Sequence, residues 1–596
     1  MLTASGATAT SARRSDQPPA KLEPPEPPTS GDRVLRALSA RLTGGISPAA
    51  VGLAYADWAF HLAASPGKWS RLAEKAVRKA IRLSTYAMRA AGDPAAPLCI
   101  EPLPQDGRFR SEAWRKWPFN VIQQAFLLNQ QWWHNATTGI GGVSKHHEQV
   151  VSFIVRQLLD TVSPVNFPAT NPEVLDATVR EGGANLVRGM TNFIADWERA
   201  AGGKPPVGAE AFRPGHEVAV TPGQVVYRNH LIELIQYSPT TEAVRPEPVL
   251  IVPAWIMKYY ILDLSPQNSM VRYLVDRGHT VFMISWRNPG SEDRDLGMED
   301  YLQSGVLEAL TTVRTITPGR KVNAVGYCLG GTLLSIAAAY LAREDSDALN
   351  SVTLLATQTD FTEPGELSLF IDESQLAYLD DIMWAQGYLD TKQMAGAFQI
   401  LRSNDLIWSR LVEGYLLGRR PLMSDLMAWN ADATRMPHRM HGEYLRRLFL
   451  DNDLFEGRYV VGGRPVALGD IRAPLFVVST ERDHVAPWRS VYKVHLLNNP
   501  DLTFLLASGG HNAGIISGPG SDGRHFRLAH DAPEEGYVDP DAWIARTEPR
   551  EGFWWSAWSD WLDARCGEPV APPPCGAPGQ GYRRLGPAPG EYVLMR

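Results

Sequence analysis

Short apolar runs alternate with longer amphipathic segments in the middle of the chain. Each run has the length and composition of a buried strand, and each amphipathic segment has the length of a helix. The runs are PVLIVPA (248–254), HTVFMISW (279–286), KVNAVGY (321–327) and SVTLLAT (351–357), and the helix-like segments are 268–277, 298–316 and 331–343. Strands that alternate with helices at this spacing form βαβ units, so the pattern predicts a mostly parallel sheet covered on both faces.

This alternation is interrupted after the fourth run. Residues 360–470 look helical, and two further strand-like runs come only afterwards, PLFVVST (474–480) and LTFLLAS (502–508). The simplest explanation is an insertion of helices that covers the carboxyl edge of the sheet, where ligands bind in open α/β sheets. We therefore expect a cap or lid over about residues 360–470.

The residues before the sheet follow a different pattern. Residues 1–32 are rich in Pro, Ser, Ala and Thr and poor in aromatic residues, which predicts a disordered tail. Residues 33–210 are helical by periodicity, and Asn171 and Pro172 are a predicted N-cap and first helical residue. The residues that follow place one apolar face at helical spacing, formed by Leu175, Val179, Leu186, Met190, Phe193 and Trp197. The predicted domains are thus a tail (1–32), a helical domain (33–210) and an α/β domain (211–596).

Composition narrows the classes of function. The chain is 44% hydrophobic and 21% charged, which suits a globular protein with a large core, and its net charge of −7 indicates no basic surface for nucleic acid. We find neither a secretion signal at the N-terminus nor an apolar stretch of about 18 residues, so no transmembrane segment is expected. The four cysteines lack the spacing of a metal site. Reduced thiols in a cytoplasmic protein are therefore the expectation.

One of these cysteines lies in the motif G-Y-C-L-G-G, residues 326–331, between a predicted strand and a predicted helix. The pattern G-x-C-x-G in this context is a nucleophile elbow with cysteine in place of the more common serine. The turn is so tight that side chains at the two glycines would collide with the neighbouring strand and helix. Cys328 would then project into the cleft, and the backbone N–H of Leu329 can serve as an oxyanion donor. The alternative is a buried structural cysteine.

A thiol nucleophile needs a base and an orienting carboxylate, which follow it along the chain in this kind of fold. Asp483 follows the strand-like run 474–480, and His511 follows the last run, 502–508. His484 is the rival base, ranked lower because it precedes the final strand. The elbow, the order of these residues and the strand pattern predict an α/β-hydrolase fold with a helical cap insertion, preceded by a mainly helical N-terminal domain.

With these residues assigned, the chain resembles the polyhydroxyalkanoate (poly-3-hydroxybutyrate) synthases, specifically the long single-subunit type, class I. The resemblance covers about residues 100–596 and follows the same order of motifs. The motifs are RFRSEAWRKWPF (108–119), SPVNFPATNPEVL (163–175), KYYILDLSP (258–266), GHTVFMISWRNP (278–289), GYCLGG (326–331), SNDLIW (403–408), DLMAWNADATRMP (425–437), ERDHVAPW (481–488) and SGGHNAGI (508–515).

The resemblance implies roles for the site residues. Cys328 would accept a 3-hydroxyacyl group from coenzyme A, and His511 would be the general base that activates it. Asp483 would orient His511 or assist deprotonation of the incoming 3-hydroxyl. The backbone amides of Leu329 and of the residue near Ile256 look like the oxyanion hole.

The same resemblance implies partners. The substrate would be (R)-3-hydroxyacyl-CoA, short-chain as in 3-hydroxybutyryl-CoA, and coenzyme A is part of this substrate, so no separate cofactor is implied. Trp429 matches a tryptophan tied to activity and dimerisation. The implied assembly is a homodimer on the surface of cytoplasmic polyester granules, with the cap gating the cleft and excluding water from the acyl enzyme.

Four features are open at this point. Met257 replaces an asparagine that the family often has beside the oxyanion loop, and Gly509-Gly510 before His511 could loosen the histidine loop. Arg402 and Lys258 are candidate cations for coenzyme A phosphates, with solvated surface charges as the alternative. The aromatic cluster at 553–561 is either a packed closing helix or a contact with polymer.

Two other functions remain as alternatives. An intracellular polyester depolymerase or thioesterase could use the same Cys-Asp-His triad, and the triad alone does not separate it from a synthase. A non-catalytic granule-binding paralogue is the third hypothesis, against which the intact triad argues.

Overall fold

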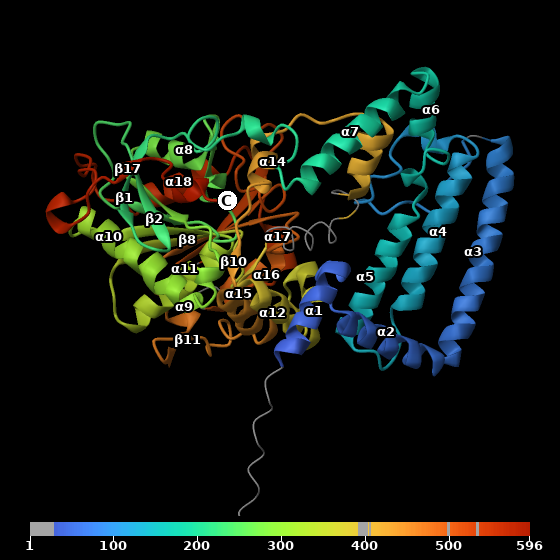
Figure 1. The fold of residues 1–596 in the computed structure, drawn as a ribbon, viewed down its shortest axis with the longest axis horizontal. Coiled ribbons are helices and arrows are strands. Elements are labelled where there is room, and N and C mark those ends of the chain that lie inside the picture. Colours follow the sequence, from blue (N-terminus) through green and yellow to red (C-terminus); the bar gives the residue numbers. More distant parts are fainter. Residues whose placement is uncertain (1–28, 94, 391–402, 404–406, 498–500, 532–535) are drawn as a thin grey trace, which may run out of the picture.

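An 11-stranded sheet forms the centre of the larger half of the molecule, with strand order β16-β15-β14-β13-β8-β7-β3-β6-β2-β1-β17 (Figure 1). The computed structural model describes residues 29–93, 95–390, 403, 407–497, 501–531 and 536–596. The six strands predicted from the sequence are adjacent and parallel. They are β3 (Val249–Val252), β6 (Val281–Trp286), β7 (Val322–Tyr327), β8 (Leu349–Leu355), β13 (Leu475–Thr480) and β14 (Leu502–Ala507).

The flanking strands, which the sequence analysis did not predict, are antiparallel to their neighbours and widen the sheet at both edges. They are β1 (Gly223–Arg228), β2 (Ile232–Tyr237) and β17 (Gly586–Pro587) at one edge, and β15 (His525–Asp531) and β16 (Arg550–Glu551) at the other.

Both faces of the parallel strands are buried. In β3, Leu250 and Val252 pack into one hydrophobic cluster, while Val249 and Ile251 pack into another on the opposite face. This follows from the two-residue period of a strand and explains why the predicted strands read as continuous apolar runs. The first cluster includes helices α10 (Glu308–Ile316) and α11 (Leu329–Arg343), and the second includes α8 (Met270–Asp276) and α18 (Trp555–Asp563).

The predicted cap lies between β8 and β13. Its described elements are mostly helical, with two short strand pairs. They are η7 (Gly365–Phe370), α12 (Glu373–Gln386), β9 (Tyr388–Leu389), η9 (Leu411–Leu416), α14 (Asp425–Asn430), β10 (Met436–Pro437), α15 (His438–Tyr444), η10 (Leu445–Leu450), β11 (Val460–Val461), β12 (Arg464–Pro465) and η11 (Leu468–Asp470).

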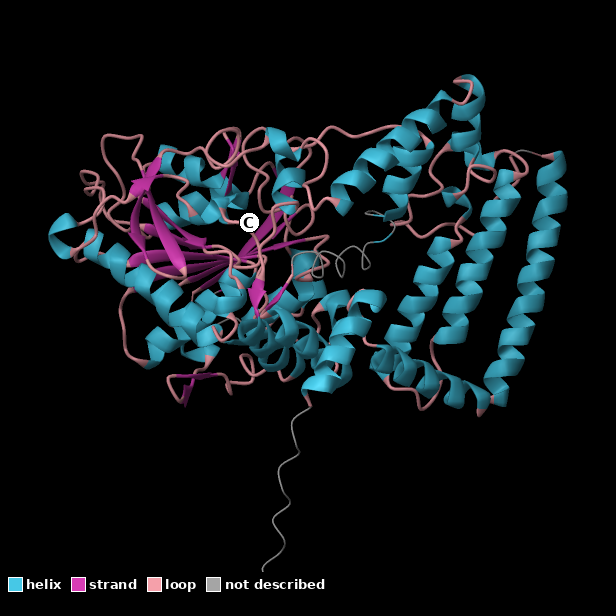
Figure 2. Ribbon diagram, in the orientation of Figure 1, coloured by secondary structure: helices cyan, strands magenta, loops and turns pink. Residues whose placement is uncertain are grey.

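A separate body of helices lies beside the sheet domain, on the right in Figure 2, where no strand is drawn. Its helices are α2 (Pro48–Ala63), α3 (Pro66–Gly92), α4 (Phe119–Thr137), α5 (Lys145–Thr161), α6 (Pro172–Arg180) and α7 (Ala184–Ala201). The first helix, α1 (Ser30–Thr43), lies apart from them and packs on α12 of the cap. Helix α1 begins at Ser30, within the last residues assigned to the tail, while residues 1–28 lie outside the described part of the chain.

The helical domain contacts the cap through several helices, among them α1, α5 and α7. On α1, Arg36 pairs with Asp381 of α12 at 3.0 Å. On α7, Asn192 donates to the carbonyl of Gly414 in η9 at 3.0 Å, and a side chain at Gly189 would overlap the carbonyl of Tyr415. The cap is therefore held between the central sheet and the N-terminal helices.

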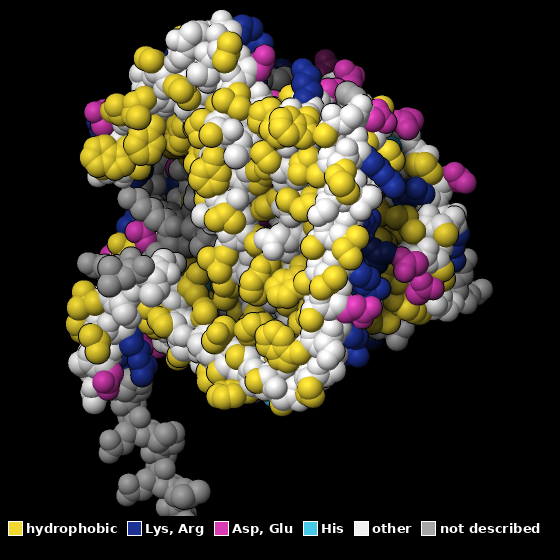
Figure 3. All heavy atoms as spheres, turned by 90° about the vertical axis from the view of Figure 1, so that its right-hand side faces the viewer, with side chains coloured by type: hydrophobic (Ala, Val, Ile, Leu, Met, Phe, Trp, Pro, Cys, Tyr) yellow, Lys and Arg dark blue, Asp and Glu magenta, His cyan; other side chains and the backbone are white. Residues whose placement is uncertain are grey.

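The apolar face predicted on α6 and α7 forms, but the described residues leave most of it exposed. Asn171 caps α6 by accepting from the amides of Glu173 and Val174, as predicted. The large exposed side chains here are Val179, Val187, Met190, Phe193, Ile194 and Trp197. Figure 3 shows apolar side chains spread over this side of the molecule.

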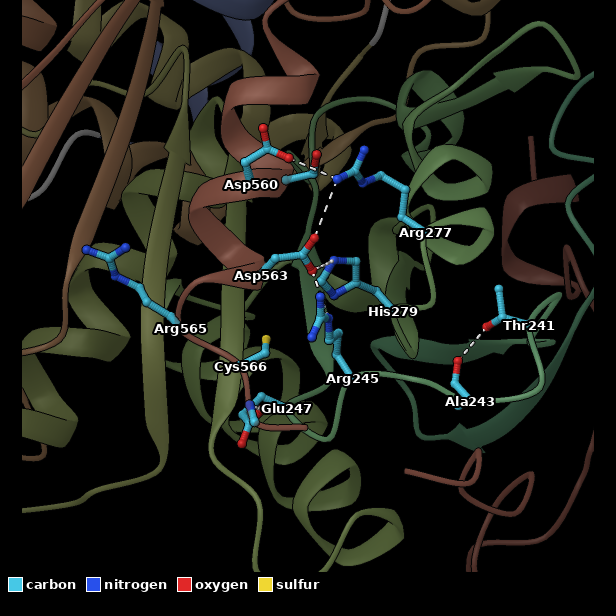
Figure 4. Close-up of polar contacts among 12 residues, drawn as sticks. Thr241, Ala243, Arg245, Glu247, Arg277, His279, Asp560, Asp563, Arg565 and Cys566 are labelled. Carbon is cyan, nitrogen blue, oxygen red and sulfur yellow. Dashed lines mark hydrogen bonds and ion pairs between the residues drawn. The ribbon is translucent and has the colours of Figure 1, made fainter. Parts of the chain in front are cut away.

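Ion pairs connect helix α18 to residues at the amino ends of the strands (Figure 4). Asp563 lies 3.0 Å from Arg245, 3.4 Å from Arg277 and 3.4 Å from the buried ring of His279. Burial raises the pKa of Asp563, but hydrogen bonding and charge from His279, together with the charge of Arg245, bring this pKa below its ordinary value. The carboxylate therefore stabilises the fold in its charged form.

We expect Asp563→Asn to lower the free energy of unfolding at pH 7 by about 1–2 kcal/mol, between the values for exposed and buried ion pairs. Because the folded pKa is depressed, this contribution is present above the unfolded pKa, about 3.9, and is lost as pH falls through the folded value. Denaturant unfolding at pH 7 and pH 3 measures it. Asp560→Asn is the matched control, since Asp560 is 69% exposed and pairs with Arg277 alone among the described ion pairs. Equal effects of the two substitutions would contradict the prediction.

Candidate active site

Cys328 lies at the turn between β7 and α11, in a backbone conformation that only a tight turn requires. Its φ is 52° and its ψ is −123°, which is strained for a residue with a side chain. The glycines around it make room for this turn. A Cβ at Gly326 would overlap Gly331, and one at Gly330 would overlap the carbonyls of Val252 and Pro253. The backbone of the elbow thus packs directly against the end of β3.

Asp483 and His511 meet on the loops after β13 and β14. His511 Nδ1 lies 2.7 Å from Asp483 Oδ2, and each residue is only 8% exposed. The other carboxylate oxygen of Asp483 accepts from the amides of Val485 and Ala486, both at 2.8 Å. These two hydrogen bonds fix the orientation of the Asp483 carboxylate, so that Oδ2 faces the ring of His511.

The charges of the three candidate residues act on one another. Burial lowers the pKa of His511, but the charges of Asp483 and Cys328 and hydrogen bonds to both raise this pKa well above its ordinary value. Burial raises the pKa of Asp483, and the charge and hydrogen bond of His511 bring it below its ordinary value. Of the two candidate bases, it is therefore His511 that the structure pairs with Asp483, and the charge of His511 is coupled to that of Cys328.

The histidine loop is tied down despite its doubled glycine. Gly509 has a φ of 114°, which glycine tolerates, and its carbonyl accepts from the amide of Arg482 at 2.9 Å. Two buried tryptophans hold the other side of the loop, since the indoles of Trp554 and Trp555 donate to the carbonyls of Gly514 and Ile515 at 3.0 and 2.8 Å. The aromatic cluster is thus a packed closing helix at these residues.

Both predicted oxyanion amides border the elbow. The amide of Leu329 is the first in α11, so it has no acceptor within the helix. Ile256 lies in the loop after β3, whose base packs against Gly330. Met257, the departure from the family pattern, forms an antiparallel bridge with Ala433 of the cap through its backbone.

Trp429 and Lys258 are both buried, and a hydrogen bond connects them. Trp429 is 3% exposed, and its indole donates to the carbonyl of Lys258 at 2.8 Å. The Lys258 side chain is buried as well, and its ammonium donates to the carbonyls of Met595 and Tyr592 at 2.6 and 3.3 Å. Burial lowers the pKa of Lys258 to about 8. Lys258 is therefore neither a solvated charge nor an open site for phosphate, and Arg402 lies outside the described residues.

Sequence reasoning missed three residues at the site. Tyr327 donates to Asn512 at 2.6 Å, and its ring lies 5.8 Å from that of His511. Both residues lie inside quoted motifs, so their position beside Cys328 and His511 was the available signal. Tyr444 of the cap packs in the same hydrophobic cluster as Leu329, and its ring lies 6.2 Å from that of Trp255. Burial raises the pKa of Tyr444, and the charge of Cys328 raises it further. No signal in the sequence pointed to Tyr444, since it is 116 positions from Cys328.

Metal-binding clusters and membrane-spanning helices are both absent from the described ranges. No group of three or more His, Cys, Asp or Glu side chains there has an arrangement that could hold a metal ion. The helices in the same ranges are all too short or too polar to cross a membrane.

Comparison with known proteins gives consistent matches along the chain. Residues 105–274 match the family model for the N-terminus of poly-beta-hydroxybutyrate polymerase (PhaC), residues 26–68 match a model for the N-terminal part of poly-beta-hydroxybutyrate polymerase, and residues 247–517 match the alpha/beta hydrolase fold. Among solved structures, a monoacylglycerol lipase from Paleococcus ferrophilus is 14% identical, covers 56% of this chain and 99% of its own, and has a TM-score of 0.30.

Three curated relatives, each named as a poly(3-hydroxyalkanoate) polymerase or a subunit of one, are similar to this chain over most of their length. The poly(3-hydroxyalkanoate) polymerase of Methylorubrum extorquens is 42% identical over 83% of this chain and 82% of its own. The poly(3-hydroxyalkanoate) polymerase subunits of Rhizobium etli and Cupriavidus necator are 37% and 36% identical, over 83% and 82% of this chain and 78% and 83% of their own.

Proposed function

The chain belongs to the poly(3-hydroxyalkanoate) polymerase family and is an enzyme of the acyltransferase type, and we propose that it is a class I synthase, which polymerises short-chain (R)-3-hydroxyacyl-CoA through an acyl-cysteine on Cys328. The observation that carries the mechanism is the 2.7 Å contact between Asp483 and His511, and the charge of Cys328 helps to raise the pKa of this His511. A nucleophile, a base and an orienting carboxylate in this arrangement suit acyl transfer.

The first step forms the acyl enzyme. Since Nδ1 of His511 contacts Asp483, Nε2 is the nitrogen that takes the proton of the Cys328 thiol. The sulfur attacks the thioester carbonyl, and the amides of Leu329 and Ile256 stabilise the oxyanion. The C–S bond to coenzyme A then breaks, and its sulfur leaves with the proton from His511. One thioester replaces another, so the exchange is close to neutral in free energy.

The second step forms the ester. The 3-hydroxyl of the next acyl group attacks the acyl-cysteine and gives its proton to His511, which returns it to the Cys328 sulfur as the C–S bond breaks. An oxyester replaces a thioester, and this more stable product draws the cycle forward. Water would compete with the hydroxyl, so the cap over the elbow has a chemical purpose in excluding it.

We extend the proposal to the surface of the polyester. Homodimers on cytoplasmic granules are the family's expected assembly, and Trp429 would support the dimer indirectly, from a buried position in the cap. Helix α7 supports a contact with an apolar surface, because its apolar side chains Val187, Met190, Phe193, Ile194 and Trp197 are exposed.

The hydrolase alternative is less favoured, because the relatives over most of the chain are named polymerases. Incubation with 3-hydroxybutyryl-CoA decides between the two. We expect release of coenzyme A together with polymer, and neither from Cys328→Ala, which should keep its fold by circular dichroism. Release of free 3-hydroxybutyrate without polymer would support a thioesterase, and unchanged turnover in Cys328→Ala would overturn the mechanism.

A further inference from the structure

The cap contributes a hydroxyl group to the back of the oxyanion loop. Thr434, 1% exposed, donates through Oγ1 to the carbonyl of Trp255 at 2.7 Å. The amide of Thr434 donates to the next carbonyl along, that of Ile256, at 3.3 Å. A residue 179 positions away in the sequence therefore contacts two successive peptide groups of the loop after β3.

The first of these peptide groups is the important one. The carbonyl of Trp255 and the amide of Ile256 belong to the same planar, trans peptide unit, so they point in opposite directions. Holding the oxygen on one side fixes the direction of the N–H on the other. A hydrogen bond to the oxygen also polarises the unit and strengthens the N–H as a donor.

Neighbouring contacts prevent the loop from turning away from the cap. Met257 and Ala433 form an antiparallel bridge, and the indole of Trp429 donates to the carbonyl of Lys258 at 2.8 Å. On its other side the base of the loop packs against Gly330. The cap segment that runs from the end of α14 to Thr434 thus lies against the loop, and Ala433 pairs with it as a residue of a neighbouring strand would.

We propose that Thr434 is a positioning residue for the reaction: its hydroxyl orients and polarises the Trp255–Ile256 peptide so that the Ile256 amide can stabilise the oxyanion. This rests on the proposed function, in which that amide is an oxyanion donor. It also explains why Met257 can replace an asparagine, since the loop is held through backbone groups and a threonine of the cap rather than through the side chain at 257.

The test compares Thr434→Val with Thr434→Ser. Valine keeps the shape and removes the hydroxyl, and we expect kcat for coenzyme A release to fall about tenfold with KM unchanged, less than the 10²–10³ for complete loss of an oxyanion donor. Thr434→Ser should stay within about twofold of the wild-type protein, because it keeps the donor. The matched control is Ser265→Ala, which removes another hydroxyl bond between core and cap, to Asp425 at 2.6 Å, away from the loop.

A second readout separates positioning from a merely structural role. Alkylation of Cys328 by iodoacetamide forms no oxyanion, so its rate should be the same in Thr434→Val and the wild-type protein, while acylation by 3-hydroxybutyryl-CoA slows. Equal slowing of both reactions, or an unchanged kcat, would overturn the inference.

Two further comparisons keep the test decisive. If the valine variant does not fold, Thr434→Ala and Thr434→Ser both lose the methyl group and differ only in the hydroxyl, so the ratio of their kcat values gives the same answer. Should the wild-type protein make no polymer, the proposed function fails. If polymer forms with dependence on Cys328 but not on the hydroxyl of Thr434, this inference alone fails.

Discussion

Cys328→Ser is expected to keep the fold and to lower polymerisation by at least about 10³-fold, within the range seen when a member of a catalytic triad is removed. A serine hydroxyl gives up its proton far less readily than a thiol, and His511 is arranged to take that proton. Any acyl group transferred to serine would be an oxyester, which a hydroxyl attacks less readily than a thioester. Both halves of the reaction therefore slow.

The measurement is coenzyme A release under saturating 3-hydroxybutyryl-CoA, with mass spectrometry of the acid-quenched protein to locate the acyl group. Cys566→Ser is the matched control. Burial raises the pKa of Cys566 to about 12. This cysteine lies near Glu247 at the amino ends of the strands, whereas Cys328 lies at the carboxyl end of β7, so replacing Cys566 should leave turnover unchanged (Figure 4). More than a tenth of the wild-type rate in Cys328→Ser, or acylation elsewhere, would contradict the role of the thiol.

Asp483→Asn is expected to lower kcat by about 10⁴-fold, the effect of placing the imidazole in the wrong tautomer. The amide can donate to Nδ1 of His511, which leaves the proton on Nε2, where the thiol proton must go. The substitution also removes the first of the charges that raise the pKa of His511, so this pKa should fall. The residual pH–rate profile should therefore shift its step for the His511–Cys328 pair to lower pH.

Stability should change with pH in a defined way in the same variant. The pKa of folded Asp483 is depressed, so its contribution is present above the unfolded pKa, about 3.9, and is lost as pH falls through the folded value. The pKa of folded His511 is raised, so its contribution is full below the unfolded pKa, about 6.5, and is lost as pH rises through the folded value. The loss of Tm in Asp483→Asn should therefore be largest between about pH 4 and 6.5.

Glu481→Gln is the matched control for both measurements. Glu481 pairs with His525 at 3.1 Å from the same loop, outside the proposed site, so its loss should leave kcat near the wild-type value. A similar loss of activity in both variants would show that kcat depends on the structure of the loop and not on the carboxylate of Asp483. An unchanged pH–rate profile in Asp483→Asn would contradict the assigned coupling.

Local patterns predicted the parallel strands because each is a short apolar run between helices, and burial on both faces leaves that mark in the sequence. They did not predict the flanking antiparallel strands. β17 has only two residues, Gly586 and Pro587, and becomes a strand only because β1 lies beside it. The elbow was also predictable from local sequence, because the glycines that its tight turn requires all lie within a few residues of Cys328.

The sequence alone determined the order along the chain of the six parallel strands and the helices between them, the position of the cap and the three residues that could form a triad. These depend on periodicity and on close neighbours in the chain. Only the tertiary structure decided that Lys258 is buried against Tyr592 and Met595, and that Thr434 contacts the loop of Trp255. Such contacts join residues 179 to 337 positions apart, and their energies depend on which surfaces meet when the chain folds, a property that no short stretch of sequence carries.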